Sequence, residues 1–78
     1  MYMKRIEYYK QLQQNGMLSK LYMGGLIDST PFLMIDTYDL RNALSNKTRS
    51  FNKETAETLN ISVSYVNKLI RLANEVIF

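Results

Sequence analysis

The chain has 78 residues, no cysteine, no histidine, a formal charge of +3 and a pI near 9.3. We expect a single domain over residues 1–78, which buries only about 60% of the surface of its unfolded chain. Disulfides, ordinary zinc sites and histidine or cysteine catalysis are excluded, so we expect a binding module without a cofactor or metal rather than an enzyme. No apolar run approaches the ~20 residues that cross a bilayer, and the N-terminus lacks a secretory signal pattern. A cytoplasmic protein is expected.

The N-terminal third predicts two short helices. Residues 3–14 form an amphipathic pattern that should end at Asn15-Gly16, because glycine tolerates the left-handed conformation found at helix ends. Its apolar stripe carries Tyr2, Ile6 and Tyr9. A weaker element over residues 17–23 ends at Gly24-Gly25, which lacks the other features of a phosphate-binding loop and indicates a break between helices.

A third helix is predicted over residues 31–45. Ser29 or Thr30 can cap it, and Pro31 suits its first position because the missing N–H would have no partner there. Residues 32–35 are continuously apolar, so a short strand stays open as an alternative, although the proline and the length favour a helix. The face that should be buried carries Leu33, Leu40 and Leu44. We expect Asp28, Asp36 and Asp39 to cap helices or face solvent, since they lack calcium-loop spacing.

Residues 52–71 contain two short helical patterns that meet at a tight polar turn. The first covers residues 53–59, and Ser50 or Asn52 can cap it. The turn is Asn60-Ile61-Ser62, and Ser62 is also the expected cap of the last helix. The apolar stripe of the last helix should extend towards the end of the chain, through Val66, Leu69, Ile70, Ala73, Val76 and Ile77.

The details of this segment match a known DNA-binding pattern. Ala56 is a small residue where the helices would cross, and a Ser-x-Ser-x-Val sequence opens at Ser62 after the tight turn. The segment therefore resembles the helix-turn-helix of small bacterial and phage transcriptional regulators. Thr55 departs from the aliphatic residue usual in that family but can pack its methyl group inward. Asn60 replaces the commonest glycine, and asparagine is the residue after glycine that best adopts a positive φ. We predict an all-α fold, a small bundle of four to five short helices with a C-terminal helix-turn-helix.

The resemblance implies that the helix beginning at Ser62 lies in the major groove of double-stranded DNA. Asn67 can bond an adenine edge, and Lys68 can donate to guanine O6 and N7. The candidates for base contact are Val63, Ser64, Tyr65, Asn67 and Lys68. The candidates for phosphate contact are Lys47, Arg49, Lys53, Ser62 and Arg71.

The expected function is sequence-specific DNA binding, as in a small transcriptional regulator of phage or mobile-element type. We expect a homodimer, because two modules on half-sites about one helical turn apart bind more tightly than one. The candidate interface is Val76, Ile77 and Phe78, with Tyr2 and Tyr9 as further members. Two alternatives stay open: a DNA-packaging adaptor such as a small terminase-like subunit, and a helical protein–protein interaction module. No small-molecule ligand or membrane contact is predicted.

Overall fold

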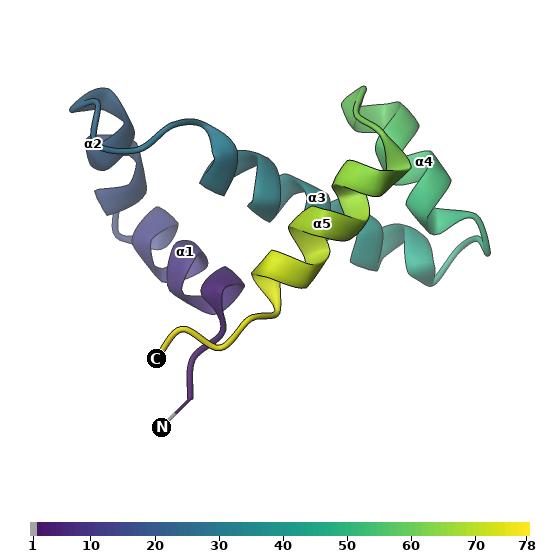
Figure 1. Cartoon of the computed structure of the whole chain (residues 1–78), viewed down its shortest axis with the longest axis horizontal. Coiled ribbons are helices and arrows are strands. Elements are labelled where there is room, and N and C mark those ends of the chain that lie inside the picture. Colours follow the sequence, from purple (N-terminus) through teal and green to yellow (C-terminus); the bar gives the residue numbers. More distant parts are fainter. Residues whose placement is uncertain (1) are drawn as a thin grey trace.

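Five α-helices make up most of residues 2–78, the part of the chain that the computed structural model describes (Figure 1). They are α1 (Arg5–Gln14), α2 (Met17–Met23), α3 (Thr30–Ser45), α4 (Phe51–Leu59) and α5 (Val63–Ala73). No strand of a sheet occurs between residues 2 and 78. The prediction of a small all-α bundle is confirmed, and residues 32–35 are helical.

The central helix is α3, which contacts α1, α4 and α5 (Figure 1). Its fully buried residues are Pro31, Met34, Ile35 and Thr37. The predicted face of Leu33, Leu40 and Leu44 is only half-buried. Because α3 has neighbours on more than one side, its apolar residues divide between several contacts instead of forming one inward stripe.

The main core lies where α1, α2, α3 and α5 meet. Its buried members are Ile6, Leu18, Met34, Ile35, Leu69 and Ala73. Tyr9 packs against this cluster, as its place on the α1 stripe predicts. Tyr2 is 85% exposed, because α1 begins only at Arg5 and Tyr2 lies outside the helix.

The start of α3 is capped by Asp28, one of the aspartates expected to cap helices or face solvent, and not by Ser29 or Thr30. Ser29 precedes the helix but its side chain makes no capping bond, and Thr30 is already helical. Instead, the N–H of Thr30 donates to Oδ1 of Asp28 at 2.9 Å. This hydrogen bond to the backbone of Thr30 lowers the pKa of the Asp28 carboxyl. Asp28 therefore caps α3 in its ionised form.

The start of α4 also differs from the prediction, since neither Ser50 nor Asn52 provides a side-chain cap. Oδ1 of Asn52 accepts a 2.7 Å hydrogen bond from Nε of Arg41 on α3. The Arg41 guanidinium lies 4.8 Å from the centre of the Phe51 ring. These contacts hold Phe51 and Asn52 against α3, so α4 begins at Phe51, two residues earlier than expected.

Both ends of the described chain meet at one corner of the molecule (Figure 1). The N–H of Ile77 donates to the carbonyl of Met3 at 2.9 Å, and the N–H of Met3 donates to the carbonyl of Phe78 at 3.0 Å. Lys4 and Val76 form an antiparallel bridge between the Ile77–Met3 bond and a 2.8 Å bond from the N–H of Arg5 to the carbonyl of Glu75. We call residues 3–5 and 75–78 the terminal pair. The prediction that the last helix continues to Ile77 is wrong, because the chain leaves α5 after Ala73 to make this pairing.

Candidate nucleic-acid interface

The turn between α4 and α5 has the geometry expected from its sequence. Asn60 has φ 57° and ψ 45°, and it is the one non-glycine residue between positions 2 and 78 with a positive φ. The N–H of Ile61 donates to the carbonyl of Ala56 at 3.0 Å, and the N–H of Asn60 donates to the carbonyl of Glu57 at 3.3 Å. These two bonds form a Schellman motif that ends α4. The predicted role of Asn60 is confirmed.

Small and apolar residues are buried on the inner sides of α4 and α5. Ala56 is 4% exposed, and Val66 on α5 is completely buried. Thr55 is also completely buried, and its hydroxyl donates to the carbonyl of Phe51 at 2.7 Å. Threonine therefore replaces an aliphatic residue here without leaving its hydroxyl unpaired.

Ser62 determines where α5 begins. Its side-chain oxygen accepts a 3.0 Å hydrogen bond from the N–H of Tyr65, which is the arrangement of an N-cap. The predicted cap is confirmed. The hydroxyl hydrogen of Ser62 is not used in this bond, so the exposed side chain can still donate to an acceptor.

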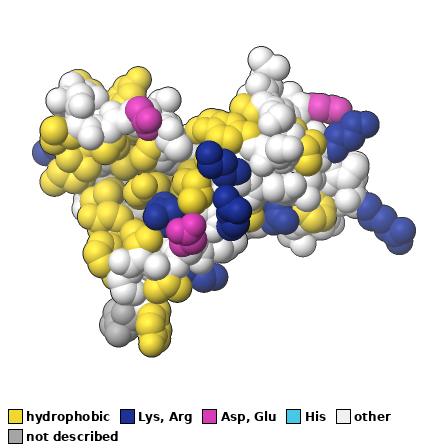
Figure 2. Space-filling model, in the orientation of Figure 1, with side chains coloured by type: hydrophobic (Ala, Val, Ile, Leu, Met, Phe, Trp, Pro, Cys, Tyr) yellow, Lys and Arg dark blue, Asp and Glu magenta, His cyan; other side chains and the backbone are white. Residues whose placement is uncertain are grey.

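Four polar residues lie in one row along the uncovered side of α5. They are spaced at three and four residues, which places them on one helical face, and all are exposed. We call this row the outer stripe: Ser64, Asn67, Lys68 and Arg71. These side chains line a shallow, open depression. Figure 2 shows dark blue Lys and Arg side chains over α5 on the face that the outer stripe occupies.

The predicted base-contacting residues separate into two groups. Ser64, Asn67 and Lys68 belong to the outer stripe, and Val63 is 41% exposed in the first turn of the same helix. Tyr65 is half-buried and packs against the core, so its ring is largely committed to holding α5 in place. Arg71, which was expected to contact phosphate, lies in the outer stripe beside the base-contacting candidates.

The two basic residues of the outer stripe form no ion pair with an acidic side chain of residues 2–78. Arg5 pairs with Glu75 and Lys10 pairs with Asp39, whereas Lys68 and Arg71 have no acidic partner within residues 2–78. The other phosphate candidates, Lys47, Arg49 and Lys53, are exposed on the α3–α4 connection and in the first turn of α4. In Figure 1 the α3–α4 connection and the start of α4 lie on the side of the molecule away from α1 and α2.

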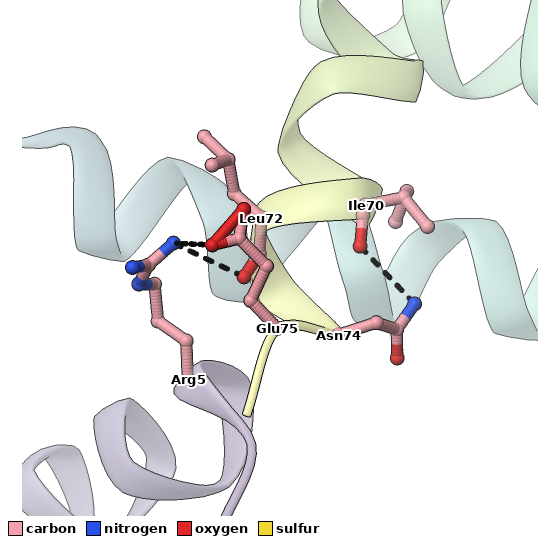
Figure 3. Close-up of polar contacts among 5 residues, drawn as sticks. All are labelled: Arg5, Ile70, Leu72, Asn74 and Glu75. Carbon is pink, nitrogen blue, oxygen red and sulfur yellow. Dashed lines mark hydrogen bonds and ion pairs between the residues drawn. The ribbon is translucent and has the colours of Figure 1, made fainter. Parts of the chain in front are cut away.

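The C-terminal end of α5 is held by Arg5, a residue that the sequence did not connect with this helix. Nη1 of Arg5 donates to the carbonyl oxygen of Leu72 at 3.3 Å and lies 3.5 Å from Oε2 of Glu75 (Figure 3). The side-chain amide of Asn74 donates to the carbonyl of Ile70 at 3.1 Å. Arg5 thus places a positive charge at the negative end of the α5 dipole. No local signal reveals this contact, because Arg5 and Leu72 are 67 residues apart.

Comparison of the chain with protein-family models, with curated proteins and with solved structures found no match in any of the three. Across residues 2–78, no three His, Cys, Asp or Glu side chains are grouped so that they could hold a metal ion. The same residues include no helix with the length and hydrophobicity needed to cross a bilayer. Function is therefore inferred from the geometry of α4 and α5.

Proposed function

We propose that this protein binds double-stranded DNA sequence-specifically, with the outer stripe of α5 in the major groove, as a small transcriptional regulator of phage or mobile-element type. The main support is that the polar side of α5 is uncovered while its opposite side is buried at Val66, Leu69 and Ala73. A helix that is held rigidly from behind can enter the major groove, which is about 12 Å wide.

The side chains of the outer stripe have the chemistry needed to read base edges. Asn67 offers a donor and an acceptor to adenine, and Lys68 donates to guanine O6 and N7. Val63, in the first turn, can contact a thymine methyl group. In this proposal Arg71, one turn further along, and Ser62, at the start of the helix, donate to backbone phosphates and set the register without reading sequence.

Three exposed cations near the N-terminus of α4 would bind a second stretch of the phosphate backbone. Lys47, Arg49 and Lys53 surround the N-terminus of α4. The unpaired N–H groups and the dipole of a helix N-terminus favour an anion there. Together with Arg71, these residues would anchor the domain on the phosphate backbone at two separate places.

We propose that two copies bind together through the terminal pair and the adjacent Tyr2. Residues opposite each other in an antiparallel pair share a face, and neighbours along the chain point to opposite faces. Tyr2, Val76 and Phe78 are 85%, 55% and 62% exposed, whereas Ile77 is half-buried and Tyr9 packs on the core. The contact surface would therefore consist of Tyr2, Val76 and Phe78. Because the terminal pair directly follows α5, a second copy would fix the spacing between the two reading helices.

Selection of bound sequences from a random duplex pool tests this function. An inverted repeat with half-site centres about 10 base pairs apart is expected for a dimer. Asn67→Ala should change the enriched sequence, whereas the control Gln13→Ala, at an exposed position of α1, should not. Absence of any enriched sequence would contradict sequence-specific binding, and a ring-sized mass in solution would favour a packaging adaptor.

A further inference from the structure

A second apolar surface lies at the end of α2, and the proposed DNA contact does not use it. Met23 is 85% exposed, Leu26 is 75% exposed and Tyr22 is 48% exposed. We call these three residues the α2 corner. Among the helices, only α1 has its backbone close to that of α2. Leu18 is buried in the core, but the side of α2 that carries Met23 is uncovered. Figure 2 shows an extended hydrophobic area over the α1–α2 end of the molecule.

The α2 corner is held in a defined shape. The N–H of Leu26 donates to the carbonyl of Leu21 at 3.0 Å, and the N–H of Gly25 donates to the carbonyl of Tyr22 at 3.1 Å. This pair of bonds closes α2 around Gly25, whose φ of 75° favours glycine. The Tyr22 ring meets the Phe32 ring edge to face, with 5.5 Å between their centres. The exposed side chains are therefore presented by a rigid helix end and not by a loose loop.

The charges near this surface are of both signs. Lys20 and Asp28 are exposed, and neither has an ion-pair partner in the described part of the chain. In a two-fold symmetric contact the same patch meets itself, so each charge approaches the residues of the other copy. A patch with charges of one sign only would repel its copy. Here the two-fold symmetry allows two equivalent attractive contacts, each between Lys20 of one copy and Asp28 of the other.

We propose that the α2 corner is a self-association surface that binds the α2 corner of a second copy of this chain. Apolar contact between Tyr22, Met23 and Leu26 supplies the buried centre, and the two Lys20–Asp28 contacts supply the polar rim. This arrangement is typical of specific protein interfaces, in which aromatic residues and methionine are enriched at the centre.

The position of the α2 corner leaves the other surfaces free. It lies at the opposite end of the molecule from α4 and away from the corner where the termini meet (Figure 1). Contact between two α2 corners therefore leaves the outer stripe of α5 uncovered. If the protein binds DNA as proposed, the contact would link neighbouring copies along a duplex and make their binding cooperative. This last step alone rests on the proposed function.

Sedimentation equilibrium without DNA tests the apolar part of the surface, on a full chain that carries Val76→Ser throughout so that the proposed contact of the terminal pair is weakened. The double variant Met23→Ser, Leu26→Ser should raise the dissociation constant of self-association at least about tenfold, because two side chains lose their burial. Met17→Ser is the matched control, since Met17 is 42% exposed on another side of α2. Circular dichroism melts establish that each variant folds. An unchanged mass distribution in the folded double variant overturns the proposal.

Charge variants test whether the occupant is a second copy. Lys20→Glu should weaken self-association, because the introduced carboxylate of one copy would face Asp28 of the other. Adding Asp28→Asn should restore part of the affinity, and asparagine keeps the oxygen that caps Thr30. Failure of that restoration overturns the Lys20–Asp28 contact. A different outcome is that the protein binds phosphatidylglycerol vesicles, that Leu26→Ser abolishes this binding, and that Leu26→Ser leaves the mass of the protein in solution unchanged. That outcome overturns the proposal that a second copy binds the α2 corner. Neither result depends on DNA, so a failure of the proposed DNA binding remains distinguishable.

Discussion

The N–H of Ile61 donates a 3.0 Å hydrogen bond to the carbonyl oxygen of Ala56 and so closes the end of α4. The bond forms because Asn60, between them, adopts the left-handed conformation. The direction in which α5 leaves α4, and hence the direction of the outer stripe, therefore depends on the conformation of a single residue.

Replacing Asn60 tests this dependence. Asn60→Ala should destabilise the fold by about 1 kcal/mol, because alanine pays the steric cost of a left-handed φ that asparagine tolerates. For a domain of this size that corresponds to a fall in Tm of roughly 4–8 °C. Asn60→Gly should keep or raise Tm. Asn42→Ala, at an exposed position of α3, is the control and should not lower Tm. Equal losses in Asn60→Ala and Asn60→Gly would contradict the conformational explanation.

The salt dependence of DNA binding tests the two cations of the outer stripe. Removing one phosphate contact reduces the slope of log K against log salt by about 0.9, so Arg71→Ala should produce a change near that value. Lys68→Ala should mainly reduce discrimination at one base pair, by about 1–3 kcal/mol. Fluorescence anisotropy between roughly 50 and 300 mM salt measures both effects. If the double variant Lys68→Ala, Arg71→Ala bound DNA as tightly as the wild-type protein, the proposal that α5 contacts DNA would be contradicted.

Arg5 should contribute more to stability than its ion-pair partner. Arg5→Ala leaves the Leu72 carbonyl at the end of α5 without its charged donor, at a cost of about 1.5–3 kcal/mol. Glu75→Gln breaks only a pair whose Glu75 side chain is 47% exposed, and such a pair contributes about 0–1 kcal/mol. Urea unfolding of both variants gives the comparison. If Glu75→Gln proved the more damaging change, the ion pair and not the helix-end contact would be the main interaction.

Asp28 predicts a pH dependence of stability with a definite sign. The Thr30 N–H lowers the pKa of Asp28 in the folded protein, so folding is favoured at pH values above the ordinary aspartate pKa of about 3.9. This contribution is lost as the pH falls through the lowered pKa of the folded state. Asp28→Asn keeps the capping oxygen but does not titrate. Melting curves between about pH 2 and pH 6 should therefore show the wild-type protein losing its advantage over Asp28→Asn at acid pH.

The helices themselves follow from local chemistry, and the sequence alone predicts them. Pro31 at the start of α3, Gly16 before α2 and the spacing of apolar residues along α5 act within a few residues of chain. The same holds for the turn, because Asn60 carries its preference for a positive φ with it, and for the cap at Ser62. The exposure of the outer stripe also follows from periodicity, since Val66 and Leu69 define the buried side of α5.

Tertiary structure decided the features that join distant parts of the chain. Arg5 meets Leu72, Val76 pairs with Lys4, and Arg41 reaches Asn52 and Phe51 in place of the caps expected from the sequence. The exposure of Met23 and Leu26 likewise depends on which helices pack against α2. Periodicity and capping act over one or two helical turns, whereas these contacts depend on how whole helices pack, and that depends on the competition of all apolar faces for one small core.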